Sequence, residues 1–116
     1  MTIKCFTDAS YSQQKKLSII GYKIGDLQIM LELLPDVKNT QAELYAIDKC
    51  IEVCNKLYPN EVIIIFTDCQ RAFKNQYEHN ITLQKIEGHK KSILKDDNDK
   101  IFSTVDKAVR RCLRNL

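Results

Sequence analysis

Two short segments of the chain place an aspartate directly after Phe-Thr, where an apolar run ends. The first segment ends at Asp8 and the second at Asp68. If both runs are strands that lie side by side and parallel, the two carboxylates share one crevice at the carboxyl edge of the sheet, where open α/β sheets bind ligands. Carboxylates this close repel each other, and a cation relieves the repulsion. Because oxygen ligands suit Mg2+ and Mn2+, the pair predicts a metal site.

Two further acids are candidates for the same site. Glu43 falls in the first turn of an expected helix, where the helix dipole favours negative charge. Asp106 falls on the last expected helix, on the side that carries apolar residues. Four carboxylates at one sheet edge would hold two divalent ions about 4 Å apart, the spacing used for in-line phosphoryl displacement. One ion would polarise the attacking water and the other would stabilise the leaving 3′-oxygen.

These acids need a sheet flanked by helices to bring them together, and the hydrophobic periodicity predicts the element order βββαβαβα. Strands are expected over residues 3–7, 17–24, 27–34, 62–67 and 81–86, and helices over residues 40–57, 70–77 and 99–113. Residues 9–16 and 88–98 are polar and are expected to form loops. Because right-handed crossovers return beside the existing sheet, the fourth strand should pair parallel with the first. The expected fold is α/β, with a mixed five-stranded sheet of order 3-2-1-4-5.

The two long helices are each expected to bury one apolar stripe. Asn39 or Thr40 should cap the first of them, with Glu43 in the capping-box position relative to Thr40. The stripe of the first helix is expected to be Glu43, Ile47, Cys50, Cys54 and Leu57, and that of the last helix Ile101, Val105, Ala108 and Cys112. Cys50 and Cys54 lie one turn apart and would be placed to share a metal, but core packing is the favoured interpretation.

The composition is that of a globular protein of one domain, residues 1–116. The net charge of +3 is a mild tilt toward polyanions. Five cysteines without C-x-x-C spacing, and no signal peptide at the start, indicate free thiols in a reducing compartment, so an intracellular protein of the cytoplasm or nucleus is expected. No apolar run approaches the ~20 residues of a membrane helix. We expect a monomer that does not bind membranes.

Several short motifs occur together in one order along nearly the whole chain. They are Asp8, the segment Asn39-Thr40-Gln41-Ala42-Glu43-Leu44, the segment Thr67-Asp68-Cys69-Gln70, Gly88-His89, and Val105-Asp106-Lys107. Each motif alone is weak, but together they resemble type 1 ribonuclease H. The resemblance implies a ribonuclease H-like fold and an endonuclease that uses two Mg2+ ions, or Mn2+, to cut the RNA strand of an RNA–DNA hybrid. The products would carry 3′-hydroxyl and 5′-phosphate ends.

The resemblance also implies a role for each matching residue. The metal-binding acids would be Asp8, Glu43, Asp68 and Asp106. Asn39 and Gln70 match positions that contact the hybrid in its minor groove, where 2′-hydroxyl groups are displayed. His89 matches a histidine that assists product departure or proton movement. Basic residues near the expected site would contact phosphates, and we assign this role to Lys15, Lys16, Lys107 and Arg111.

The chain departs from the family pattern in ways that predict a minimal form with weaker hybrid affinity. The glycine-rich turn after the first aspartate is absent. Asp106 follows His89 at a long spacing, and Phe102 stands where many members carry asparagine. There is no space for the extra helix and basic loop of larger members. Tryptophan, which these members use to grip substrate, is also absent.

Several of these residues also have a purely structural explanation. Asp8 would cap a turn, Glu43 would complete a capping box, and Asp106 would pair with Arg110 four residues later. The basic residues of the last helix would complement its dipole. Two other functions therefore stay open: a ribonuclease H-like module that binds nucleic acid with little or no cleavage, and a related nuclease that acts on DNA or structured RNA. The matches at Asn39 and Gln70 favour the hybrid.

Overall fold

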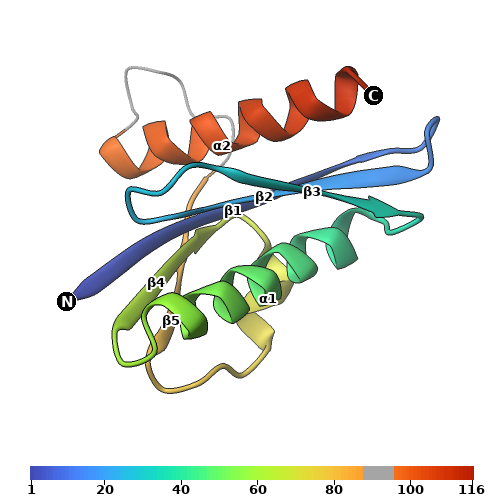
Figure 1. Ribbon diagram of the computed structural model, residues 1–116. Coiled ribbons are helices and arrows are strands. Elements are labelled where there is room, and N and C mark those ends of the chain that lie inside the picture. The colour runs from blue at the N-terminus through green and yellow to red at the C-terminus, as the bar shows by residue number, and fades with distance from the viewer. Residues whose placement is uncertain (88–95) are drawn as a thin grey trace.

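The computed structural model describes residues 1–87 and 96–116, which form one sheet between two helices (Figure 1). The elements are β1 (Thr2–Ser12), β2 (Leu17–Ile24), β3 (Met30–Pro35), α1 (Asn39–Leu57), β4 (Val62–Thr67), the 3-10 helix η1 (Gln70–Lys74), β5 (Ile81–Lys85) and α2 (Asp97–Arg114). The sheet order is β3-β2-β1-β4-β5, which confirms the expected order. α1 covers one face of the sheet and α2 covers the other.

The central pair of strands explains why two aspartates so distant in sequence become neighbours. β1 and β4 run parallel, and their pairing ends at Phe6 opposite Phe66. The two phenylalanine rings stack with centroids 4.9 Å apart and an interplanar angle of 11°. Asp8 and Asp68 each follow their phenylalanine by two residues, so the shared register brings both to the carboxyl edge of this pair.

Alternation along β1 supplies both layers of the core. Ile3 and Cys5 belong to the cluster that packs under α1, together with Ile47 and Cys50 of that helix. Phe6 faces the other way and belongs to the cluster under α2. Side chains of successive strand residues point to opposite faces of a sheet, so a single strand can serve both helices. β4 is buried on both faces in the same manner, as its unbroken apolar run predicted.

Two strand boundaries differ by more than one residue from those expected. β1 continues beyond residue 7 to Ser12, because residues 8–12 pair antiparallel with β2, from Asp8 opposite Gly21 to Ser12 opposite Leu17. The polar turn is thus shorter than residues 9–16. β3 begins at Met30 and not at residue 27, because the connection from β2 is a turn in which the Leu27 N–H donates to the Ile24 carbonyl.

The helices also differ in their ends and in the residues they bury. α1 begins at Asn39 with Lys38 as its N-cap and no side-chain cap, so the expected capping by Asn39 or Thr40 and the Thr40–Glu43 capping box are wrong. The expected helix over residues 70–77 is the shorter η1. The buried residues of α1 are Ala42, Ala46, Ile47, Cys50 and Cys54, whereas Leu57 is exposed.

The apolar stripe of α2 is shifted by one residue at most positions. α2 starts earlier than expected, at Asp97 with Asp96 as its N-cap, and it buries Phe102, Val105, Val109 and Leu113. The expected Ile101, Ala108 and Cys112 are only half-buried. Both stripes have helical spacing, and the structure buries the one that contains the larger ring of Phe102, which packs in the same cluster as Phe6 and Phe66.

Gly21 permits the close approach of α2 to the sheet at the level of Asp8. A Cβ atom at Gly21 would lie 2.5 Å from Val109 Cγ2 and 3.4 Å from Val105 Cγ1. Both valines are fully buried, and their branched side chains have little rotamer freedom. The absence of a side chain at residue 21 therefore fixes how near α2, which carries Asp106, lies to β1.

Gly21→Ala is expected to lower the free energy of unfolding by about 1–3 kcal/mol, the usual cost of overpacking a core. Urea denaturation followed by circular dichroism measures this change. The double variant Gly21→Ala/Val109→Ala, in which the clashing methyl groups are removed, should lose less stability than the two single changes added together. An unchanged midpoint in Gly21→Ala would show that the contact is not limiting.

Candidate active site

Three carboxylates converge where β1 and β4 stop pairing. Oxygen atoms of Asp8, Glu43 and Asp68 lie within 4.8 Å of one another. Asp8 comes from β1, Glu43 from the first part of α1, and Asp68 directly follows β4. Asp8 is buried, while Glu43 and Asp68 are half-buried, so solvent and ions reach the group. We refer to these three residues as the acid cluster.

Asp106 joins the acid cluster through Asp8 and stands at its margin. Its carboxyl forms a hydrogen bond with that of Asp8, and its charge acts on Asp8. The same carboxylate accepts a hydrogen bond from the Arg110 guanidinium, one helical turn along α2. The i,i+4 pair that sequence reasoning treated as an alternative is thus present together with the contact to Asp8. Arg110 supplies a positive charge next to the four acids and orients Asp106.

Burial and crowding keep the acid cluster partly protonated when no cation is bound. Burial, the hydrogen bond with Asp106 and the charge of Asp68 together raise the pKa of Asp8 to about 9. Burial and the charge of Asp68 also raise the pKa of Glu43, partly offset by a hydrogen bond with the Cys69 thiol. A divalent cation would favour the ionised forms and displace these protons.

The turn after β4 is held by a contact that sequence reasoning missed. The Cys69 N–H donates to the Thr67 hydroxyl at 3.1 Å, and this bond shapes the chain around Asp68. The Cys69 thiol in turn contacts the Glu43 carboxylate. In the sequence, the only signal for this contact is the cysteine directly after Asp68. Nothing in residues 67–70 indicates that Glu43 lies beside that cysteine.

The two residues predicted to contact the minor groove are each the first residue of a helix that contains or closely follows an acid of the cluster in sequence. Asn39 is the first residue of α1, four residues before Glu43, and Gln70 is the first residue of η1, two residues after Asp68. Both side chains are exposed. They are therefore accessible to a ligand at the acid cluster, and their roles stay predictions.

The basic residues fall into two groups. The Lys15 ammonium donates to the carbonyls of Leu113 at 2.8 Å and Leu116 at 2.9 Å, and so satisfies the C-terminal end of α2. Lys16, Lys107 and Arg111 are exposed. The structure thus gives Lys15 a role in holding the C-terminal end of α2, and its predicted contact with phosphate stays a prediction. His89, which was predicted to assist product departure or proton movement, lies outside the described residues.

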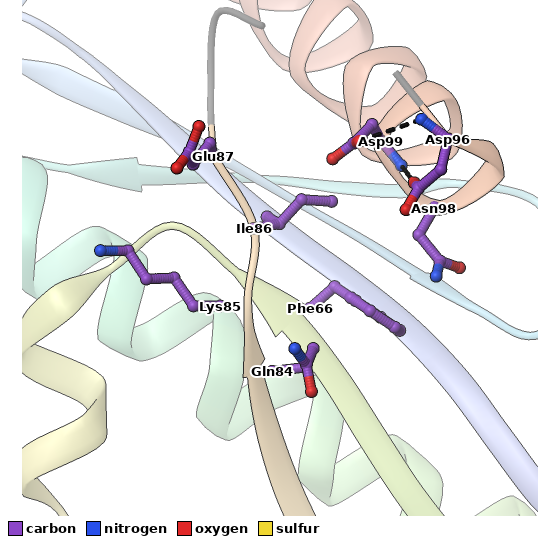
Figure 2. A pocket seen from close by; sticks show the side chains of 8 residues that line it. All are labelled: Phe66, Gln84, Lys85, Ile86, Glu87, Asp96, Asn98 and Asp99. Carbon is purple, nitrogen blue, oxygen red and sulfur yellow. Dashed lines mark hydrogen bonds between the residues drawn. The ribbon is translucent and has the colours of Figure 1, made fainter. Parts of the chain in front are cut away.

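A hollow of about 450 Å3 opens beyond the ends of β4 and β5, beside the start of α2 (Figure 2). Two of the acidic residues that line it, Asp96 and Asp99, already have partners at the start of α2. The Asp99 N–H donates to Asp96 at 2.8 Å and the Asp96 N–H donates to Asp99 at 3.0 Å, which is a capping box. These two carboxylates therefore serve the helix start, in contrast to the acid cluster.

A comparison with family models, which covers nearly the whole chain, agrees with this fold and site. The family model for RNase H matches residues 1–112. The chain belongs to the RNase H family. The mixed sheet of order β3-β2-β1-β4-β5, with helices on both faces, is the fold of RNase H. A comparison of this RNase H chain with curated proteins gives no match.

The four acids all lie within the residues that the RNase H family model matches. The family match spans β1, α1, β4 and nearly all of α2, the elements that bear Asp8, Glu43, Asp68 and Asp106. In the part of this RNase H that the structure describes, no helix is long and apolar enough to cross a membrane.

Proposed function

We propose that this RNase H chain is a metal-dependent endonuclease that hydrolyses the RNA strand of RNA–DNA hybrids and leaves 3′-hydroxyl and 5′-phosphate ends. The observation that carries the proposal is the acid cluster, whose three carboxylates lie within 4.8 Å of one another at the edge of the central strands. Membership of the RNase H family supports a nuclease. Burial and the charge of Asp68 raise the pKa of both Asp8 and Glu43, so the cluster is costly to the fold, and binding of cations explains its presence.

The donor set of the acid cluster fits a hard divalent cation. All of its ligand atoms are carboxylate oxygens, which suit Mg2+ and Mn2+ over softer ions. Asp8, Glu43 and Asp68 would hold one ion, and Asp106 would complete the site of a second ion together with Asp8. When bound, such ions lower the pKa of an attacking water and stabilise charge on the leaving oxygen.

Other residues of the chain would position the hybrid. Asn39 and Gln70 are exposed beside the acids, and their amide groups can exchange hydrogen bonds with 2′-hydroxyl groups, which only the RNA strand carries. Lys107 and Arg111 of α2 would bind phosphates. Arg110 holds the Asp106 carboxylate in place. We also propose that His89 assists departure of the product.

The test is cleavage of an end-labelled RNA–DNA hybrid in Mg2+ and in Mn2+, beside double-stranded RNA and duplex DNA. We expect internal cuts in the RNA strand of the hybrid only, and loss of cutting in excess chelator. Substitution of deoxyribose for ribose at the cleaved position should prevent cutting there if the 2′-hydroxyl is read. Cleavage of duplex DNA or duplex RNA would overturn the substrate. Binding of the hybrid without cleavage in either metal would overturn the enzyme and leave a binding module.

A further inference from the structure

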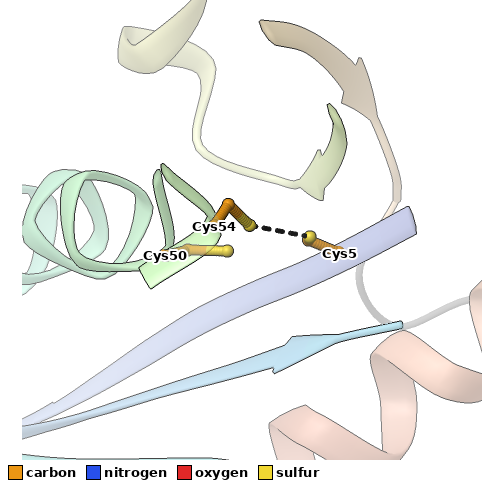
Figure 3. Close-up of side chains that lie close together, drawn as sticks. All are labelled: Cys5, Cys50 and Cys54. Atoms are coloured by element: carbon orange, nitrogen blue, oxygen red, sulfur yellow. Dashed lines mark hydrogen bonds between the residues drawn. The ribbon is translucent and has the colours of Figure 1, made fainter. Parts of the chain in front are cut away.

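Three thiols from two elements converge on the opposite side of β1 from α2. Cys5 lies on β1, and Cys50 and Cys54 lie one turn apart on α1. Their sulfur atoms all lie within 4.8 Å of one another, and those of Cys5 and Cys54 are 3.6 Å apart (Figure 3). All three side chains are fully buried. We call these residues the thiol cluster.

The spacing of the thiol cluster matches a cation coordinated by three sulfurs. At a metal–sulfur distance of about 2.3 Å, three ligands in trigonal geometry place their sulfur atoms about 4.0 Å apart. This value lies between the 3.6 Å that separates the Cys5 and Cys54 sulfur atoms and the 4.8 Å within which all three sulfur atoms lie. A cation at the centre of the triangle would therefore need little movement of the side chains. The cation would take the place of the thiol protons between the sulfur atoms, so the site needs no further cavity.

We propose that Cys5, Cys50 and Cys54 form a binding site for one soft divalent cation of the Zn2+ and Cd2+ class, separate from the acid cluster. Thiolate sulfur selects soft ions and disfavours Mg2+, so the two sites take different metals. The divalent charge is balanced by two thiolates, which limits the cost of burial. Each thiol that ionises releases one proton to solvent, and no electron is transferred. All three side chains are fully buried, so the site is closed to substrate.

The position of the thiol cluster gives such an ion a structural role. β1 carries Cys5 and Asp8, and α1 carries Cys50 and Glu43. An ion held by both elements would link the two segments that supply ligands to the acid cluster. Because the ion binds the folded chain more tightly than the unfolded one, it should raise the midpoint of thermal unfolding in a concentration-dependent way.

The test is titration of reduced, metal-free protein with Cd2+ in excess Mg2+, which occupies the acids. Because the thiols are buried, the protein is refolded from urea in the presence of each Cd2+ concentration. We expect one equivalent of Cd2+ to produce the ultraviolet charge-transfer band of cadmium bound to sulfur and to raise the unfolding midpoint. Cys54→Ser and Cys50→Ser should each lose the band, whereas Cys112→Ser, with its thiol half-buried on α2, should keep it.

Circular dichroism of each variant establishes that it is folded before its spectrum is interpreted. If a serine variant does not fold, Cys54→Val, which keeps an apolar side chain of similar size, replaces it. No band and no shift of the midpoint in the unmodified protein would overturn the proposal and leave three thiols that only pack. A band that persists in Cys54→Val, or that is lost in Cys112→Ser, would overturn it as well. None of these outcomes depends on nuclease activity.

Discussion

Asp68→Asn is expected to reduce cleavage of the RNA–DNA hybrid by about 1,000-fold or more while the protein stays folded. The amide keeps the volume of the carboxylate but removes a negative charge from the acid cluster, where the oxygens lie within 4.8 Å of one another. Metal ions in such sites contribute several kcal/mol to stabilisation of the transition state, and each 1.4 kcal/mol is about tenfold in rate. Loss of one ligand that serves the ions should therefore remove most of the catalysis.

The measurement is the single-turnover rate with a labelled hybrid at saturating Mg2+, together with circular dichroism of the variant. Asp26→Asn is the matched control, because it makes the same chemical change at an exposed residue of the β2–β3 turn, which lies beside Lys4 near the start of β1. The control should cleave at the normal rate. A normal rate in Asp68→Asn would contradict the assignment of the acid cluster as the active site.

The metal-free protein is expected to lose stability as the pH rises from about 4 to about 9. The pKa of Asp8 is about 9 in the folded protein and 3.8 at its ordinary value. Between these values the folded state holds a proton that the unfolded state has released, so the free energy of unfolding falls with pH. One proton gives a slope of at most about 1.4 kcal/mol per pH unit. The stabilisation is complete below the unfolded pKa and is lost as the pH passes the folded one.

Urea unfolding in chelator at several pH values measures this slope. The charged groups around Asp8 include Glu43, Asp68, Asp106 and, through Asp106, Arg110. Asp8→Asn carries no titrating proton at residue 8, so its stability should change less over the same range. Added Mg2+ should reverse the trend, because the ion binds the ionised form. Equal slopes in Asp8→Asn and the unmodified protein would exclude Asp8 as the origin.

The strand order was predictable because its signals are local and strong. The unbroken apolar run of residues 62–67 is typical of a central parallel strand, and the repeated Phe-Thr-Asp segments indicate two strands that end alike. The extension of β1 to Ser12 was not predictable from residues 9–12 themselves, because their strand conformation depends on pairing with β2. Propensity is weak where a partner strand decides the conformation.

Side-chain partners across elements were the least predictable part of the site. The motifs pointed to all four acids, but only the fold shows that Asp106 reaches the cluster through Asp8 and pairs with Arg110. Helical spacing predicted that Cys50 and Cys54 are buried, yet it contains no information on Cys5, which depends on how α1 lies across β1. The choice between Ile101 and Phe102 likewise depended on the volume available under α2.

The parallel pairing of β1 with β4 has a consequence for how the protein folds. The strands that form this pair are separated by β2, β3 and α1, so the pairing closes a long loop and is expected to be slow. The β1–β2 hairpin, by contrast, requires only a short loop. A partly folded chain with the hairpin and α1 would still lack the neighbour that places Asp68 beside Asp8. Competence to hold a divalent ion should therefore appear only once β1 and β4 have paired.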